Sequence, residues 1–175
     1  MRLRRWCACC FIVCFALSEA RAGDYRTDYD RYFEREARVY LPFFDWHYLR
    51  YQGIAESGLD RNARSPAGAV GLMQFEPATA RELSINPLDP QSAIHGAAIY
   101  DRTLFNAWPQ TATLPNRRDL MFASYNAGLG NIEKAARLAG KLIWAAVAAM
   151  LPRVTGKNAG QTVEYVKRIN KMAGD

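Results

Sequence analysis

One acidic side chain stands where a carboxyl group could act on a substrate. Glu56 closes an apolar stripe, at spacings of three and four residues, that consists of Trp46, Leu49 and Gly53. In the last turn of a helix, unpaired backbone carbonyls disfavour a carboxylate anion, and burial in an apolar cleft would raise its pKa further. Such a group can stay protonated near neutral pH and act as a general acid.

Cleavage of a glycosidic bond needs a proton donor of this kind, because the departing sugar oxygen must be protonated as the bond opens. Ordinary glycosidases also need a second carboxylate. Asp60, Glu76 and Glu82 follow Glu56 in the sequence, but no pattern singles one of them out as its partner. The residue types therefore favour acid-catalysed cleavage of a glycan and leave the second step open.

The elements around Glu56 are a helix and a loop. Gly58 is well placed to end the helix in a left-handed conformation. Residues 59–71 have no period and contain Asn, Ser, Pro and Gly, which predicts an ordered loop rather than a strand. Gly68 and Gly71 would let the backbone turn tightly and come close to a glycan.

Three side chains near this loop have simple structural interpretations when each is taken alone. Ser65 is typical of a loop-stabilising serine turn, and Gln74 is typical of an exposed amide. Met73 is more often core filler than a ligand contact, and we expect it in the core.

The stretch from 55 to 80 resembles the signature of the lytic transglycosylases with a goose-lysozyme-like fold. The shared motifs are Glu-Ser at 56–57, Ser-Pro-x-Gly at 65–68, Gly-Leu-Met-Gln at 71–74 and Pro-Ala-Thr-Ala at 77–80. Several motifs at fixed gaps over about 25 residues are far more specific than a lone glycine motif.

The resemblance implies that one Glu serves twice and that the substrate is peptidoglycan. Glu56 would protonate the departing oxygen of the β-1,4 bond between N-acetylmuramic acid and N-acetylglucosamine. It would then draw the proton from the C6 hydroxyl, giving a 1,6-anhydro product without water and without a cofactor. Ser65 would hold the N-acetyl or ring region, and Gln74 would help to form the groove floor.

Two further motifs resemble those of the family. Residues 124–128, Ser-Tyr-Asn-Ala-Gly, resemble Ala-Tyr-Asn-Ala-Gly. Here Tyr125 would pack in the cleft wall and hydrogen-bond to Glu56 or the substrate. Asn126 would bind substrate by resemblance, although Asn and Gly also make a good helix end.

The last motif carries one of two departures from the family. Residues 161–166, Gln-Thr-Val-Glu-Tyr-Val, resemble Glu-Thr-x-x-Tyr-Val, with Tyr165 lining the groove. Gln161 replaces the family's acid, so a role that needed a charge is lost while hydrogen bonding is retained. The other departure is Glu76, which either raises the pKa of Glu56 by like-charge repulsion or points to solvent, and solvent is slightly favoured.

The whole chain is expected to be mostly α-helical, with a single lysozyme-like domain and no convincing strand period. Starts are predicted near Thr27 or Asp28, at Asp45 and Asn116 as N-caps, and at Pro77 and Asp89-Pro90. The predicted helices cover 28–40, 45–56, 78–83, 90–108, 116–126, 131–138, 142–151 and 161–172. The run 142–151 is interpreted as a buried helix, because ten residues are too few to cross a bilayer.

The first 22 residues are typical of a secretory signal peptide, with a basic start, an apolar run and a small-residue cleavage site before Gly23. The mature domain would then be 23–175, with an N-terminal helix in 23–40 and a core in 41–175, exported to the periplasm. All four cysteines lie in the leader, so the mature chain would have neither a disulfide nor a thiolate nucleophile. No transmembrane segment is expected after cleavage.

Charge and motif content exclude several other functions. The chain carries a net charge of +6, of which the leader supplies three, leaving about +3 for an anionic wall or membrane surface. The basic pairs at 117–118 and 167–168 are isolated and are interpreted as solvated helix surface, not a nucleic-acid site. With only His47 and His95 available, a zinc site is not expected.

Two alternatives to the transglycosylase reading are left open by the sequence. A hydrolytic lysozyme of the same fold would be favoured by a well-placed second carboxylate such as Asp60 or Glu76. A weakly active or inactive wall-binding accessory protein of a secretion or conjugation complex would be consistent with Gln161 and with the small size of the chain.

Overall fold

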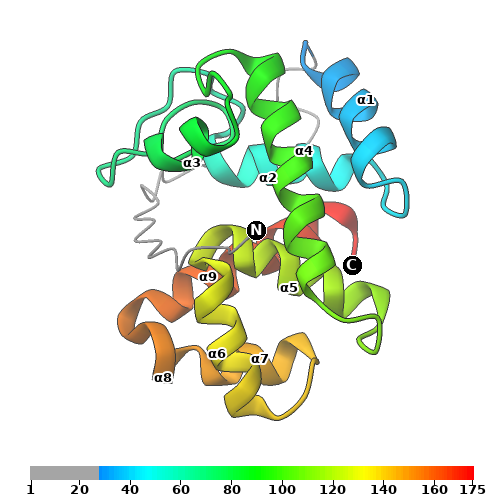
Figure 1. Ribbon diagram of the computed structural model, residues 1–175, viewed down its shortest axis with the longest axis vertical. Helices are drawn as coiled ribbons and strands as arrows, with labels where there is room; N and C mark the ends of the chain where they lie inside the picture. Colours follow the sequence, from blue (N-terminus) through cyan, green and yellow to red (C-terminus); the bar gives the residue numbers. More distant parts are fainter. Residues whose placement is uncertain (1–27) are drawn as a thin grey trace. The chain divides into compact units, whose positions relative to one another are not determined.

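A computed structural model describes residues 28–175 (Figure 1). The predicted leader, residues 1–22, lies outside the described residues together with its four cysteines and with Thr27. The described helices are α1 (Asp30–Tyr40), α2 (His47–Ser57), α3 (Pro77–Glu82), α4 (Pro90–Ala107), α5 (Leu114–Ala127), α6 (Leu129–Ala139), α7 (Trp144–Met150), α8 (Pro152–Thr155) and α9 (Ala159–Ala173). No strand occurs in this part of the chain beyond isolated bridges, which confirms the predicted mostly helical class.

The described chain divides into two compact units. The first unit comprises residues 28–102 and 168–175, and the second comprises residues 103–167. The division therefore falls within α4 and again within α9. The predicted domain boundaries at 22 and 40 stay predictions.

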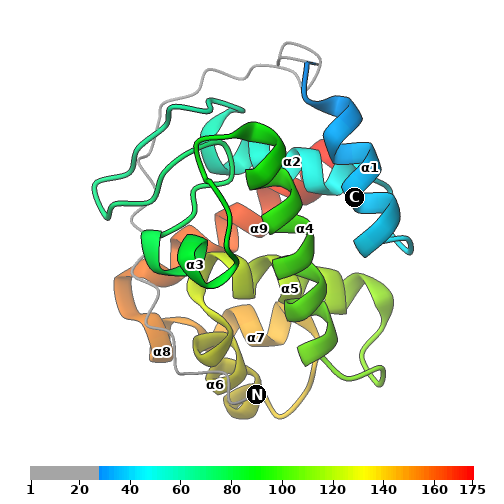
Figure 2. The ribbon, with the colours of Figure 1, turned by 45° about the horizontal axis from the view of Figure 1, so that its top comes forward.

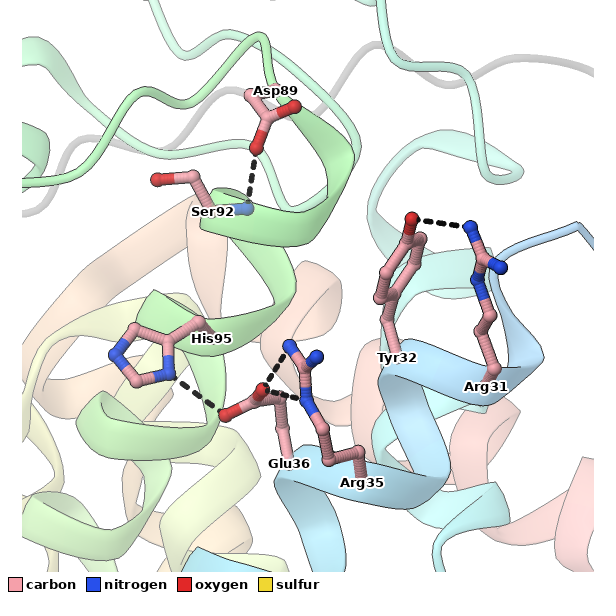
Figure 3. Close-up of polar contacts among 7 residues, drawn as sticks. All are labelled: Arg31, Tyr32, Arg35, Glu36, Asp89, Ser92 and His95. Atoms are coloured by element: carbon pink, nitrogen blue, oxygen red, sulfur yellow. Dashed lines mark hydrogen bonds and ion pairs between the residues drawn. The ribbon is translucent and has the colours of Figure 1, made fainter.

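In the first unit, α1 packs against α2 and is tied to α4 by a buried carboxylate. Glu36 is 5% exposed, its Oε2 lies 2.7 Å from His95 Nδ1, and its Oε1 accepts a 2.7 Å hydrogen bond from Arg35 Nε (Figure 3). A Glu side chain is rarely buried unless it is paired. The two partners explain how α1 can turn this charged residue towards α4.

The start of α2 differs slightly from the prediction. The helix begins at His47 with Trp46 in the cap position, so Asp45 is not the N-cap residue itself. Asp45 Oδ1 still accepts a 2.9 Å hydrogen bond from the His47 backbone N–H, which would otherwise be unpaired at the helix start. This hydrogen bond holds the pKa of Asp45 below its usual value.

Prolines mark the starts of α3 and α4, as predicted. Pro77 and Pro90 are the first residues of their helices, where a missing N–H costs little. Asp89 caps α4, because its Oδ2 accepts a 2.8 Å hydrogen bond from the Ser92 backbone N–H (Figure 3). The signals at both positions are local in sequence, which is why they could be read from it.

In the second unit, α5, α6, α7 and α8 pack against one another. Figures 1 and 2 both show α6 beside α7. The predicted buried helix at 142–151 is only partly right, because α7 is shorter and Val147 is its one buried residue. Ile143 before it is 49% exposed. Many residues of this segment are alanines, whose small side chains can lie at the surface at little cost. The apolar composition of the segment therefore did not imply that it is buried.

Asn116 does not begin α5. That helix starts at Leu114, with Thr113 in the cap position and a proline in its first turn. Asn116 Oδ1 instead accepts a 2.8 Å hydrogen bond from the backbone N–H of Trp144, the first residue of α7. The Asn116 side chain thus accepts a hydrogen bond from an unpaired N–H at the start of a helix, but that helix begins 28 residues further along the chain.

The interpretation of the basic pairs as solvated surface is wrong for Arg117 and Arg118. Arg118 is 8% exposed, and Arg117 is half-buried. Arg117 donates to the carbonyls of Trp108 at 3.1 Å and Phe105 at 3.2 Å, at the end of α4. A cation there compensates carbonyls that have no partner within the helix.

Among the described residues, no single helix has the length and apolar character to cross a membrane. One pair, Leu129–Ala139 and Trp144–Ala173, bent by 100°, meets the length and composition requirements jointly.

Candidate active site

Glu56 lies in the last turn of α2, as predicted. It is half-buried, and its neighbours Ile54 and Ala55 are buried. Gly58 ends the helix with φ of 65°, the left-handed conformation that the sequence predicted. The carboxyl group therefore stands near the carbonyl end of the helix, where a negative charge is less stable.

The turn that carries Glu56 is fixed to the segment that follows the loop. Ser57 Oγ donates a 2.7 Å hydrogen bond to the backbone carbonyl of Leu72. One turn earlier, a Cβ on Gly53 would lie 3.1 Å from Met73 Sδ, so the absence of a side chain lets the two segments approach. Met73 is fully buried, which confirms it as a core residue.

Ser65 braces the loop between α2 and α3. Its Oγ accepts a 3.0 Å hydrogen bond from the Ala69 N–H, and its carbonyl accepts one of 3.0 Å from the Gly68 N–H. This is the serine turn that the residue types indicate. Gly68 has φ of 90° and open space where a Cβ would stand, so glycine is needed here for backbone conformation.

Gly71 and Gln74 hold the other end of the loop. A Cβ on Gly71 would stand 1.8 Å from the carbonyl oxygen of Pro87, so glycine allows two backbone segments to meet. Gln74 has φ of 49°, and its Nε2 donates to the carbonyls of Gly71 at 2.8 Å and Ala63 at 3.3 Å. The Gln74 amide is half-buried rather than exposed, and a role in a groove floor stays a prediction.

The acidic residues named as possible second carboxylates occupy different surroundings. Asp60 is exposed, and its Oδ1 accepts a 2.8 Å hydrogen bond from the Asn62 N–H, as in an Asx turn. Glu76 is half-buried and directly precedes α3. Whether Glu76 acts on Glu56 stays a prediction.

Sequence reasoning missed a buried acid on which the charge of Glu56 acts. Asp101 is fully buried on α4, and burial raises its pKa well above the usual range; the hydrogen bond from Gln52 lowers it, and the charge of Glu56 raises it. A signal for it exists in the sequence. Asp101 stands four residues after Ala97 and three before Leu104, on the apolar face of the helix, where a lone acid is unusual.

In the second unit, Asn126 links two helices. Asn126 Oδ1 accepts a 2.9 Å hydrogen bond from Thr162 Oγ1, and both side chains are buried. The predicted helix end is confirmed at Gly128, which takes the cap position of α5, whereas Asn126 lies within the last turn of the helix. The second and third motifs therefore contact each other through these two residues.

The remaining predicted site residues also lie in the second unit. Tyr125 is half-buried on α5, Gln161 is half-buried in the first turn of α9, and Tyr165 is 4% exposed on α9. Glu56, with its loop, lies in the first unit. That these residues share one substrate site stays a prediction.

In the part of the chain that the structure describes, no group of three or more His, Cys, Asp or Glu side chains could hold a metal ion. His47 Nδ1 lies 2.6 Å from Asp45 Oδ1, and His95 is paired with Glu36.

Curated relatives resemble the chain over most of its length. It is 34% identical over 132 residues to the membrane-bound lytic murein transglycosylase F of Shewanella pealeana, covering 72% of this chain and 28% of that protein. It is 35% identical over 143 residues to the protein of the same name from Maricaulis maris, covering 78% and 31%. The chain thus spans less than a third of the length of these relatives.

Solved structures share its fold. The 70 kDa soluble lytic transglycosylase of Escherichia coli matches with a TM-score of 0.63 and 23% identity, over 86% of this chain and 25% of that chain. An inactive mutant of lytic transglycosylase Slt from Pseudomonas aeruginosa matches with a TM-score of 0.67 and 22% identity, over 85% and 24%. The lysozyme-like helical fold that the sequence predicted is confirmed.

A family model described as "Transglycosylase SLT domain" matches residues 45–146. This region contains Glu56, the loop after it and the Tyr125 motif, and it makes up more than half of the chain. The chain therefore belongs to the transglycosylase SLT domain family.

Proposed function

We propose that the chain cleaves the β-1,4 bond between N-acetylmuramic acid and N-acetylglucosamine in peptidoglycan, leaving 1,6-anhydro-N-acetylmuramic acid ends. Glu56 is the general acid and then the general base. The observation that carries this proposal is the position of Glu56, half-buried in the last turn of α2 and joined through Ser57 to the segment that follows the loop. Membership of the transglycosylase family supports the same reaction.

The proposed steps balance without water. The Glu56 proton moves to the oxygen of the departing sugar as the C1–O bond breaks, and positive charge develops on the muramic ring. The C6 hydroxyl oxygen then bonds to C1, and its proton returns to the Glu56 carboxylate. The enzyme is restored, and the new intramolecular bond forms the anhydro ring.

The glycan contacts come from the motif residues. The Ser65 hydroxyl accepts from a loop N–H and can donate its own hydrogen to the sugar's acetamido group. Gln74, Tyr125, Asn126, Gln161 and Tyr165 are proposed as further contacts. Asn126 uses its carbonyl oxygen on Thr162, which leaves its NH₂ group as the one that would serve the substrate.

The proposed location is the periplasm, reached through residues 1–22 as a leader. Its relatives named membrane-bound lytic murein transglycosylases support a place in the cell envelope. Local opening of the wall for a secretion or conjugation complex is the physiological role that such a chain would suit, and the partner would be part of that complex.

Digestion of purified peptidoglycan with the purified protein tests the proposal. Mass spectrometry of the released muropeptides should find anhydro ends, with none above background for Glu56→Gln. Reducing ends would assign the chain to the hydrolytic lysozymes instead. Binding to the glycan without products would support the wall-binding accessory protein and overturn the proposed reaction.

A further inference from the structure

A buried polar pair lies one helical turn before Glu56. Gln52 and Asp101 are both fully buried, and Gln52 Nε2 donates a 3.3 Å hydrogen bond to Asp101 Oδ1. Gln52 precedes Glu56 by four residues, so the two side chains share one face of α2. The pair therefore links the face of α2 that carries Glu56 to α4.

If Asp101 is an ionised carboxylate, the hydrogen bonding between Asp101 and Gln52 is incomplete. Gln52 Oε1 and Asp101 Oδ2 are both buried without a hydrogen-bond partner. Such atoms are costly in a protein interior. A proton on Asp101 Oδ2 would remove both deficits, because a carboxylic acid and an amide can form two parallel hydrogen bonds.

The charges around Asp101 favour that proton. Burial raises the pKa of Asp101, and the charge of Glu56 raises it again, while the Gln52 hydrogen bond is the only contribution that lowers it. The neighbouring cation Arg102 is directed to the Tyr40 carbonyl and the Phe43 ring, and Arg168 to the Ile54 carbonyl. No cation is among the groups that shift Asp101.

We propose that Asp101, paired with Gln52, is a positioning residue that supports the proton exchange of Glu56. This inference rests on the proposed function, because it assumes that Glu56 donates the proton. Asp101 cannot contact a sugar itself, since it has no exposed surface. Asp101 acts by holding the helical turn of α2 that precedes Glu56, through its hydrogen bond with Gln52, and by remaining neutral.

Neutrality matters when Glu56 loses its proton. An ionised Asp101 would add a second negative charge that repels the new Glu56 carboxylate. Asp101 is fully buried, and no cation is among the groups that shift its pKa, so that charge would be poorly compensated. Glu56 is half-buried and Asp101 fully buried, so ionisation costs less at Glu56. The buried acid therefore keeps its proton throughout the reaction while Glu56 gives up its own and recovers it.

An NMR titration tests this without relying on activity. In protein with ¹³C-labelled Asp carboxyl groups, Asp101 should keep its proton well above the pH at which an ordinary Asp titrates. Glu56→Gln removes a charge that acts on Asp101 and should lower the pH at which it titrates. Glu36→Gln, which neutralises another buried carboxyl of the same unit, should leave that titration unchanged. Ordinary Asp behaviour, or no response to Glu56→Gln, would overturn the inference.

Kinetics supply the second test. Asp101→Leu fills a similar volume without hydrogen bonds and should lower kcat at least tenfold with little change in KM. Asp101→Asn can donate to Gln52 Oε1 as a protonated acid would, and should recover most of that loss. Equal losses of kcat in the two variants would contradict the proposal that Asp101 acts as a neutral hydrogen-bond partner of Gln52. If either variant fails to fold, the NMR titration of the wild-type protein decides whether Asp101 is neutral. A wild-type protein that lacks activity but shows the coupled titration would reject the proposed function and retain the pair.

Discussion

Thr162 Oγ1 donates a 2.9 Å hydrogen bond to Asn126 Oδ1, and both residues are buried. The two residues belong to motifs 36 positions apart, at the end of α5 and in the first turns of α9. A motif residue assigned by resemblance to substrate binding thus has a structural partner of its own. Removing the partner should affect stability directly.

Thr162→Val should destabilise the fold by about 1–3 kcal/mol, because valine keeps the shape but leaves the Asn126 oxygen buried and unpaired. Urea unfolding of the variant measures the loss. Thr111→Val in an exposed turn is the matched control and should change stability by less than about 0.5 kcal/mol. Equal effects of the two substitutions would show that the hydrogen bond adds nothing.

The loop glycines should differ in how they tolerate alanine. Gly68→Ala should cost about 1–2 kcal/mol, because the backbone has a positive φ but the space is open. Gly71→Ala should cost at least about 3 kcal/mol, since the methyl group would strike the Pro87 carbonyl. Chemical unfolding compares the two variants, and a smaller loss for Gly71→Ala would mean that the loop is not packed as described.

Glu56→Gln should lower the rate of muropeptide release by at least about 10²–10⁴-fold, because an amide cannot donate and recover the proton. Circular dichroism and the melting temperature should show that the fold is retained. Glu34→Gln on the exposed side of α1 is the control and should release products at the wild-type rate. Full activity of Glu56→Gln would exclude the mechanism.

Asp101 should make stability fall as pH rises. Its pKa is raised in the folded state, so above the ordinary Asp value of about 3.9 the folded chain holds a proton that the unfolded chain releases. Asp101→Asn has no proton to lose. The variant should therefore gain stability relative to the wild type as pH rises above about 4, measured by urea unfolding at several pH values. A difference that does not change with pH would mean that Asp101 titrates alike in both states.

Local signals explain which parts of the fold could be predicted. Pro77, Pro90 and Gly58 act through their own backbone conformations, so their effects did not depend on distant residues. Asn116 shows the limit. Its side chain satisfies a helix start far along the chain, and sequence alone offers no means of choosing that helix over the one beside it.

The candidate site shows the same division. The position of Glu56 and the serine turn at Ser65 follow from short spacings and were predicted. The pairing of Gln52 with Asp101 crosses 49 residues, and its consequence depends on complete burial. The anomaly of an acid on an apolar helix face was visible, but its partner was not.

The loop after α2 has an irregular backbone, yet its internal contacts favour ligand binding. Ser65 and Gln74 satisfy backbone groups within the loop, and Gly71 lets it rest directly against the Pro87 carbonyl. A ligand that reaches this surface finds it already ordered, so binding loses little affinity to the freezing of a mobile segment. The loop can thus select a ligand by shape complementarity to a preorganised surface, although it contains neither helix nor sheet.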